Sequence, residues 1–150
     1  MKVKIEDIKK LREITGAGIA DCRVALEETK GDLVTAEKIL HKKGLEIAAK
    51  KAERQVKAGM VFAYVHHTGR LGTMVGLACE TDFVAKTDDF QKLGKELAMQ
   101  VAASNAGDVK ELLESEYIRD PAKKVSDLIK ETIGKLGENI QVVGLQVMVV

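Results

Sequence analysis

The spacing of the apolar residues changes near Gly59, and this change constrains the fold more than any other feature of the sequence. Before Gly59, apolar residues recur three or four positions apart, as on one face of a helix, beginning with Ile5, Ile8 and Leu11. After Gly59, apolar residues run together or alternate with small and polar ones, as they do in strands. Helices followed by a mixture of strands and helices predict two modules, the second of the α+β class.

The first module, residues 1–44, is predicted to be a bundle of three short helices. Gly16 and Gly18 interrupt the apolar pattern and separate the first helix from the second. Asp32 is a suitable N-cap for the third helix, and Gly44 is expected to end it. About forty residues is near the lower size limit for a domain that folds alone.

A basic segment, residues 45–58, follows the bundle and is interpreted as a linker with helical tendency. Its positive charges could contact phosphate groups. A solvated helix face is the preferred interpretation, because no aromatic or Gly-rich partner accompanies these charges. The residues concerned are Lys50, Lys51, Arg54 and Lys57.

The second module, residues 59–150, is predicted to hold a three-stranded antiparallel sheet packed with helices. Segments 60–66 and 71–80 are joined by a turn of hairpin type, and segment 140–150 forms the last strand, with a bulge at Gly144. One face of the second strand carries small residues, which predicts a helix or another chain close to the backbone. These small residues are Gly72, Gly76 and Ala78.

Three helices are expected between the second and the last strand. Asp88 is the predicted N-cap of the first, with Gln91 at the capping-box position. A short helix is expected over 109–117. The third helix is predicted to begin at Asp120-Pro121 and to end at Gly137.

Segment 140–150 is apolar almost throughout, although a three-stranded sheet leaves two edges unpaired. A monomer would expose this strand or cover it incompletely. We therefore expect the chain to self-associate or to dock tightly on a partner.

No arrangement of residues is typical of a catalytic or metal site. His41, His66 and His67 lack neighbouring ligands at close, regular spacing, and the sequence has no Gly-rich phosphate-binding loop. A Cys79 nucleophile paired with either His of the hairpin remains an alternative, although a buried thiol is preferred. We expect no enzyme activity, no cofactor and no metal.

Composition and charge indicate a packed cytoplasmic protein. The chain is 45% hydrophobic and 31% charged, with a formal net charge of +1 that does not favour direct contact with nucleic acid. Cys22 and Cys79 lie among apolar neighbours, as reduced thiols do. Residues 1–11 lack the apolar core of a secretion signal, and no apolar run approaches the ~20 residues of a membrane span.

The connector after the second strand allows two interpretations. It places Phe83 and Val84 between the charged residues Asp82 and Lys86. Phe83 could pack back on the next helix as a hydrophobic staple, which the residues alone favour modestly. Alternatively, it could protrude as an aromatic anchor for a partner's pocket.

A resemblance to a known family bears on this choice. The run Thr81-Asp82-Phe83-Val84-Ala85 resembles a signature of the elongation factor Ts family. Leu11-Arg12-Glu13, with the Thr15–Gly18 and Asp21-Cys22 segments, is similar to the family's N-terminal signature, and Gly137-Glu138-Asn139-Ile140 is similar to the motif that opens its last strand. The three motifs occur in the family's order and cover most of the chain.

The resemblance implies a non-catalytic factor that promotes release of guanosine diphosphate (GDP) from elongation factor Tu. Asp82 and Phe83 would wedge into the GTPase domain of elongation factor Tu. The first module would be similar to ubiquitin-associated (UBA) domains and would dock on the same domain. The resemblance implies that the partner-binding residues are Thr81, Asp82, Phe83, Val84, Ala85, Arg12, Ile19 and Arg23.

Departures from the family pattern leave other features open. Segment 106–117 replaces a longer helical segment of short relatives, and segment 143–145 replaces their basic and aromatic residues. Longer relatives carry two core half-domains and this chain carries one, so the resemblance to single-core relatives implies a homodimer. Two alternatives to exchange remain: an interaction module built around residues 4–44, and a small enzyme using Cys79.

Overall fold

The computed structural model describes residues 2–150 and has the predicted α+β architecture. Three helices come first: α1 (Ile5–Thr15), α2 (Ile19–Glu28) and α3 (Leu33–Lys51). The next elements are β1 (Ala58–Val65), β2 (Leu71–Cys79), α4 (Asp82–Ala85), α5 (Asp88–Ser104) and α6 (Val109–Glu114). The chain ends with β3 (Glu116–Tyr117), β4 (Asp120–Lys124), α7 (Val125–Leu136) and β5 (Ile140–Val149).

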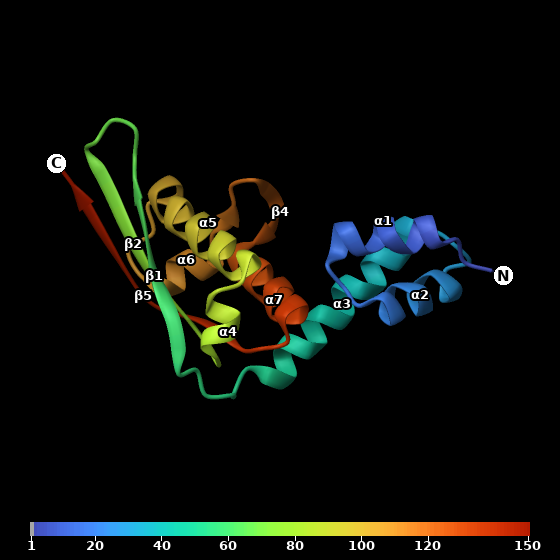
Figure 1. Cartoon of the computed structure of the whole chain (residues 1–150). Helices are drawn as coiled ribbons and strands as arrows, with labels where there is room; N and C mark the ends of the chain where they lie inside the picture. Colours follow the sequence, from blue (N-terminus) through green and yellow to red (C-terminus); the bar gives the residue numbers. More distant parts are fainter. Residues whose placement is uncertain (1) are drawn as a thin grey trace.

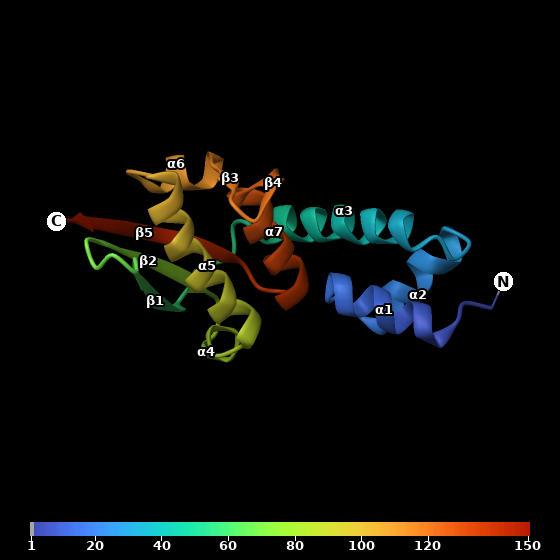
Figure 2. The same cartoon turned by 90° about the horizontal axis from the view of Figure 1, so that it is seen from above.

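The molecule is elongated, with α1 and α2 at one end and the three-stranded sheet at the other (Figures 1 and 2). α3 starts in the N-terminal bundle and runs toward the sheet, packing along α7 on the way. α3 therefore connects the two ends of the molecule as one continuous element.

The N-terminal bundle has a small core of its own, and its three helices confirm the sequence prediction. Asp32 caps α3 as expected: its carboxylate accepts hydrogen bonds from the backbone N–H groups of Val34 and Thr35. Gly16 ends α1 in the left-handed region, at φ 68°. The buried residues that hold the bundle together are Leu11, Cys22, Ala25, Leu26, Ala36 and Leu40.

The predicted end of the third helix at Gly44 is wrong, because α3 continues to Lys51. Gly44 instead lies where α3 crosses α7, directly against Gly134. A glycine in each helix allows the two backbones to approach closely at this crossing. The expected boundary between residues 44 and 45 therefore falls inside a helix, and half of the predicted linker is helical.

The sheet has the order β1-β2-β5, with both pairs antiparallel, as predicted. β2 is central, and its odd-numbered residues face α5: Val75, Leu77 and Cys79 are all buried. Gly76 pairs with Gly144 and Leu77 pairs with Val142, so Val143 is an extra residue in β5. This bulge lies beside Gly144, where the sequence predicts one.

The other face of the sheet carries no helix of residues 2–150, and the helices lie on one side only (Figure 1). The small residues of β2 therefore do not receive a helix of this chain. Exposed apolar side chains surround them on all three strands: Val61, Val65, Met74, Val143 and Met148. We call this surface, together with the small residues of β2, the open sheet face.

The predicted N-cap of α5 is also wrong by one residue. Thr87, rather than Asp88, caps the helix, and its hydroxyl accepts a hydrogen bond from the backbone N–H of Phe90 at 3.3 Å. The same hydroxyl donates to the carbonyl oxygen of Val84 at 2.7 Å. Thr87 therefore ties α4 to α5, which Asp88 could not do because a carboxylate does not donate a hydrogen bond.

The prediction that a helix begins at Asp120-Pro121 is wrong. Asp120–Lys124 is the strand β4, which pairs with β3, and α7 begins at Val125. The carboxylate of Asp127 accepts from the backbone N–H of Lys124 at 3.1 Å and so caps the true start. The β3–β4 hairpin forms in place of the predicted helix start because Tyr117 and Arg119, which precede Asp120, both bind Glu96 of α5. The expected helix end at Gly137 is confirmed.

Tyr117 gives this hairpin a predictable pH dependence. Burial, followed by the hydrogen bond to Glu96, raises the pKa of its phenol from 10.0 to about 12. A raised pKa means that Tyr117 contributes stability below pH 10, and that this contribution is lost as the pH rises toward 12. At about 1.4 kcal/mol per pKa unit, the loss is on the order of 3 kcal/mol. Urea unfolding between pH 9 and 12 should show this decline, and Tyr117→Phe should lack it; equal slopes would contradict the assignment.

Candidate functional site

The connector between β2 and α5 forms a short, separately capped helix. α4 has only four residues, and Thr81 is its N-cap. The hydroxyl of Thr81 accepts a hydrogen bond from the backbone N–H of Val84 at 3.4 Å. Figure 2 shows α4 at the lower edge of the molecule, next to the start of α5.

Two side chains of α4 are exposed to solvent and two are buried in the core. Phe83 is 87% exposed, and Asp82 beside it is exposed as well. Val84 and Ala85 are 9% and 3% exposed, so they anchor the helix in the core and do not present a surface to a partner. The interpretation of Phe83 as a hydrophobic staple is wrong, because a staple residue would be covered by the helix that it packs against.

Both ends of α4 are fixed by side chains, the first by a residue distant in the sequence and the second by a residue that follows the helix. Glu138, which follows α7, accepts hydrogen bonds from the backbone N–H of Thr81 at 2.9 Å and from its hydroxyl at 2.7 Å. Thr87 closes the other end. Glu138 was not among the site residues expected from the sequence, where its place in the motif at residues 137–140 was the available signal.

Cys79 has the surroundings of a structural thiol. It is fully buried, its Sγ donates to the carbonyl oxygen of Thr81 at 3.2 Å, and burial together with the nearby Glu138 carboxylate raises its pKa. In that alternative the partners would be His66 and His67, which lie at the turn, whereas Cys79 ends β2 at the opposite end of the hairpin, about 26 Å away at ~3.3 Å per residue. Pairing with either His is therefore excluded in this structure.

Within residues 2–150, no group of three or more His, Cys, Asp or Glu side chains is placed to hold a metal ion. None of the helices in the same range combines the length and hydropathy needed to cross a bilayer.

The N-terminal site residues lie on the surface of the bundle. Ile19, the first residue of α2, is 59% exposed, and Arg23 follows one turn later on the same face. Arg23 donates from Nε to Glu27 at 2.8 Å. Arg12 is exposed in the last turn of α1. In Figure 2, α1 and α4 both lie on the lower side of the molecule, and α3 lies on the upper side.

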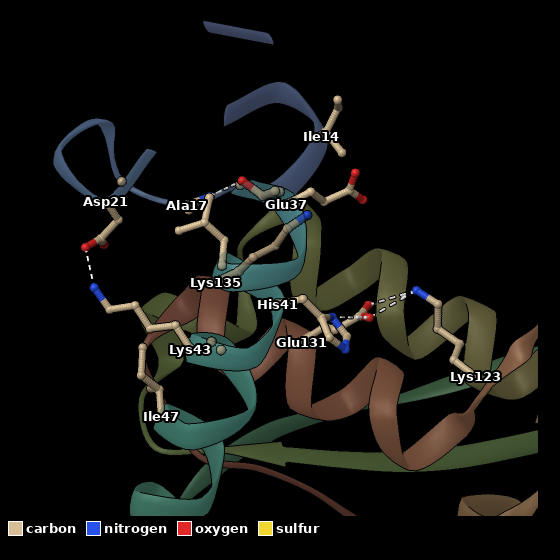
Figure 3. A pocket seen from close by; sticks show the side chains of 16 residues that line it. Ile14, Ala17, Asp21, Glu37, His41, Lys43, Ile47, Lys123, Glu131 and Lys135 are labelled. Atoms are coloured by element: carbon tan, nitrogen blue, oxygen red, sulfur yellow. Dashed lines mark hydrogen bonds and ion pairs between the residues drawn. The ribbon is translucent and has the colours of Figure 1, made fainter. Parts of the chain in front are cut away.

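A cleft of about 220 Å³ lies between the bundle and α7, and Figure 3 shows the side chains that line it. Its charges largely neutralise one another. Glu131 of α7 binds His41 at 3.0 Å and Lys123 at 3.1 Å, and Lys43 pairs with Asp21 of α2. No site residue predicted from the sequence lines this cleft. We interpret it as part of the contact between the two modules.

Comparison with known proteins identifies the family. The family model described as "Elongation factor TS" matches residues 80–150, which contain the connector, the helices α4 to α7 and the last strand, β5. Elongation factor Ts of Thermotoga neapolitana is 42% identical over 185 aligned positions, which cover 95% of this chain and 94% of that protein. The chain belongs to the elongation factor Ts family. Membership in the elongation factor Ts family places it among the translation elongation factors, which act in protein biosynthesis.

Two further elongation factor Ts proteins show how relatives differ in length. The protein of Thermoanaerobacter sp. is 42% identical over 183 positions, covering 92% of this chain and 90% of its own. That of Aquifex aeolicus is 44% identical over 146 positions, covering 94% of this chain but 50% of its own. The Thermotoga alignment is longer than the 150 residues of this chain, so that relative holds residues with no counterpart here.

Proposed function

We propose that this chain is a guanine-nucleotide exchange factor for elongation factor Tu, and that Asp82 and Phe83 form its wedge. The observation that carries the proposal is the exposure of Phe83. Phe83 is 87% exposed on a one-turn helix whose two ends are fixed. Its contact with water is unfavourable in free energy, and the side chain contributes nothing to the core. Membership in the elongation factor Ts family supports the proposal.

The wedge acts by linkage between two binding equilibria. A factor that binds nucleotide-free elongation factor Tu more tightly than the GDP-bound form lowers the affinity for GDP by the same ratio. Burying the Phe83 side chain in a partner is worth about 2–3 kcal/mol. That free energy corresponds to about a hundredfold in affinity. No covalent step and no cofactor are required.

The N-terminal bundle provides a second contact in this proposal. Ile19 would be the apolar centre of that contact, with Arg12 and Arg23 beside it. The two contacts lie on one connected body, because α3 extends from the bundle to the sheet module. Docking of the bundle would then bring α4 to a defined place on elongation factor Tu.

The release of a fluorescent GDP analogue from elongation factor Tu tests the proposal directly. Addition of this protein should accelerate release in proportion to its concentration, up to a maximum. A protein that binds elongation factor Tu without acceleration would favour the interaction-module alternative over exchange. A protein that neither binds nor accelerates would refute the proposed partner.

We also propose that the open sheet face pairs two copies of the chain. Met148 is 73% exposed on the open sheet face and lies near the end of the edge strand β5, where it pairs with Gly72. At micromolar concentration, light scattering should give the mass of two chains. Met148→Lys should give the mass of one, because a lysine would be left uncompensated in an apolar interface.

Val34→Lys is the matched control for this experiment. Val34 is also exposed, at 62%, but it lies on the N-terminal bundle, far from the sheet. The control should keep the mass of the wild type. A wild-type protein that is entirely monomeric at micromolar concentration would refute the homodimer.

A further inference from the structure

The carboxylate of Glu138 binds the connector with both of its oxygens. Oε1 accepts from the backbone N–H of Thr81 at 2.9 Å, and Oε2 accepts from the Thr81 hydroxyl at 2.7 Å. The two residues are 57 positions apart in the sequence, so the contact forms only when α7 and β5 are in place. Charge-assisted hydrogen bonds of this kind are stronger than neutral ones.

This contact sets the direction of the N-cap of α4. A threonine hydroxyl has one proton, and here that proton is donated to Glu138. The lone pairs of the same oxygen are then left to accept from the backbone N–H of Val84. A helix of four residues has little stability of its own, so its end contacts determine how it is oriented.

The backbone on either side of Glu138 is held by the C-terminal end of α3. Lys51 donates to the carbonyl oxygen of Gly137. Asn139 donates from its side chain to the carbonyl oxygens of Ala52 at 3.2 Å and Arg54 at 2.8 Å. Glu138 therefore stands on a junction between α3, α7 and β5.

The same junction is connected to β2 by a second carboxylate. Glu80, at the start of the connector, accepts from the backbone N–H of Asn139 at 3.0 Å. It also lies 3.7 Å from Arg54. The base of the connector is thus bound to residues 137–139 at two successive positions, Glu80 and Thr81.

We propose that Glu138 is a positioning residue for nucleotide exchange: its carboxylate holds Thr81 so that α4 presents Phe83 in one orientation. This inference rests on the exchange function proposed above. It assigns to Glu138 no contact with the partner. The orientation of the wedge would be linked through residues 137–139 to α3, and hence to the bundle that docks beside it.

Glu138→Gln tests the proposal with little change of shape. A carboxamide has one acceptor oxygen, so it cannot accept from both the N–H and the hydroxyl of Thr81. The maximal rate of GDP release should fall about tenfold, which corresponds to ~1.4 kcal/mol of lost orientation. The concentration for half-maximal release should change less than threefold, because the bundle still docks. Amide hydrogen exchange at Val84 should become faster, a readout that needs no partner.

Two further sets of variants separate positioning from general stability. Glu96→Gln removes a similarly covered carboxylate that binds two partners, Tyr117 and Arg119, but that lies away from the connector. It should leave the maximal rate of release unchanged. Thr81→Ser keeps the hydroxyl and should retain the rate, and Thr81→Val should lower it. Combining Thr81→Val with Glu138→Gln should cost less than the sum of the two separate losses, because both remove the same side-chain contact.

The outcomes distinguish this inference from the function on which it rests. If the wild type accelerates release and Glu138→Gln has the same maximal rate, the positioning role is refuted while the exchange function stands. A loss equal to that of Glu96→Gln would also refute it, since the effect would then follow stability alone. If the wild type does not accelerate release, the exchange function itself fails, and faster exchange at Val84 would then report only on the structure of α4.

Discussion

Replacing Phe83 with alanine should reduce the accelerated release of GDP from elongation factor Tu about a hundredfold. The side chain is almost fully exposed in the free protein, so its contact with water is lost only when a partner covers it. Burial of a phenylalanine side chain is worth about 2–3 kcal/mol, and ~1.4 kcal/mol changes a rate tenfold. The measurement is the maximal rate of fluorescent GDP release at saturating factor.

The same substitution should leave the fold unchanged. Phe83 makes no contribution to the buried core, which uses its neighbours Val84 and Ala85. The midpoint of thermal unfolding should therefore shift by less than about 2 °C, as surface substitutions usually do. This separates Phe83→Ala from a core variant such as Phe90→Ala, which should unfold the module.

Val34→Ala provides the matched control for loss of an exposed apolar side chain. Val34 lies on the bundle outside the predicted contact residues and should have no effect on release. If Phe83→Ala and Val34→Ala release GDP at the same rate as the wild type, the wedge assignment is wrong. If both variants are equally slow, the loss of any exposed apolar side chain would explain the slow release, and the wedge assignment would be wrong.

Features set by short stretches of sequence could be predicted, and the bundle and the sheet are of this kind. The Asp32 cap depends on neighbours two or three residues away. Alternation along β2 separated its two faces because the side-chain period of a strand is two, but it did not show which face the helices cover. The helix end at Gly137 likewise follows from a single glycine with φ 76°.

Features decided by distant contacts were predicted wrongly or were missed. Gly44 is a helix-end signal locally, but its position against Gly134 makes it a crossing point. Asp120-Pro121 is a helix-start signal locally, but Glu96 holds the preceding residues in a hairpin. In each case a contact with another element outweighs the local preference.

The candidate site shows the same division. The motif at residues 81–85 located the connector, yet the sequence could not show which of its side chains face solvent. Val84 and Ala85 were expected at the partner surface and lie in the core. Glu138 could be assigned to Thr81 only from the folded chain, because 57 positions separate them.

A substitution at the crossing of α3 and α7 should also have a large effect, because this crossing holds together the two parts of the chain that are proposed to contact elongation factor Tu. A Cβ added at Gly134 would lie 2.8 Å from the Cα of Gly44 and 3.3 Å from its carbonyl carbon and oxygen. These are backbone atoms, so relief requires the helices to separate. Overpacking of this kind costs about 1–3 kcal/mol, and the better helix propensity of alanine offsets up to ~1 kcal/mol.

Gly134→Ala should therefore lower the free energy of unfolding by about 1–2 kcal/mol in urea titrations. It should also raise the concentration needed for half-maximal GDP release about tenfold, because the bundle and α4 would no longer fit one partner together, and ~1.4 kcal/mol of lost binding gives that change.

The reciprocal substitution makes this prediction specific to geometry. A Cβ added at Gly44 would have its nearest contact at 3.9 Å, with the Cα of Gly134, an ordinary van der Waals distance. Gly44→Ala should thus raise the free energy of unfolding by up to about 1 kcal/mol through helix propensity and leave release unchanged. If the two alanine variants shift stability in the same direction by equal amounts, the close approach of α3 and α7 does not control the arrangement of the modules.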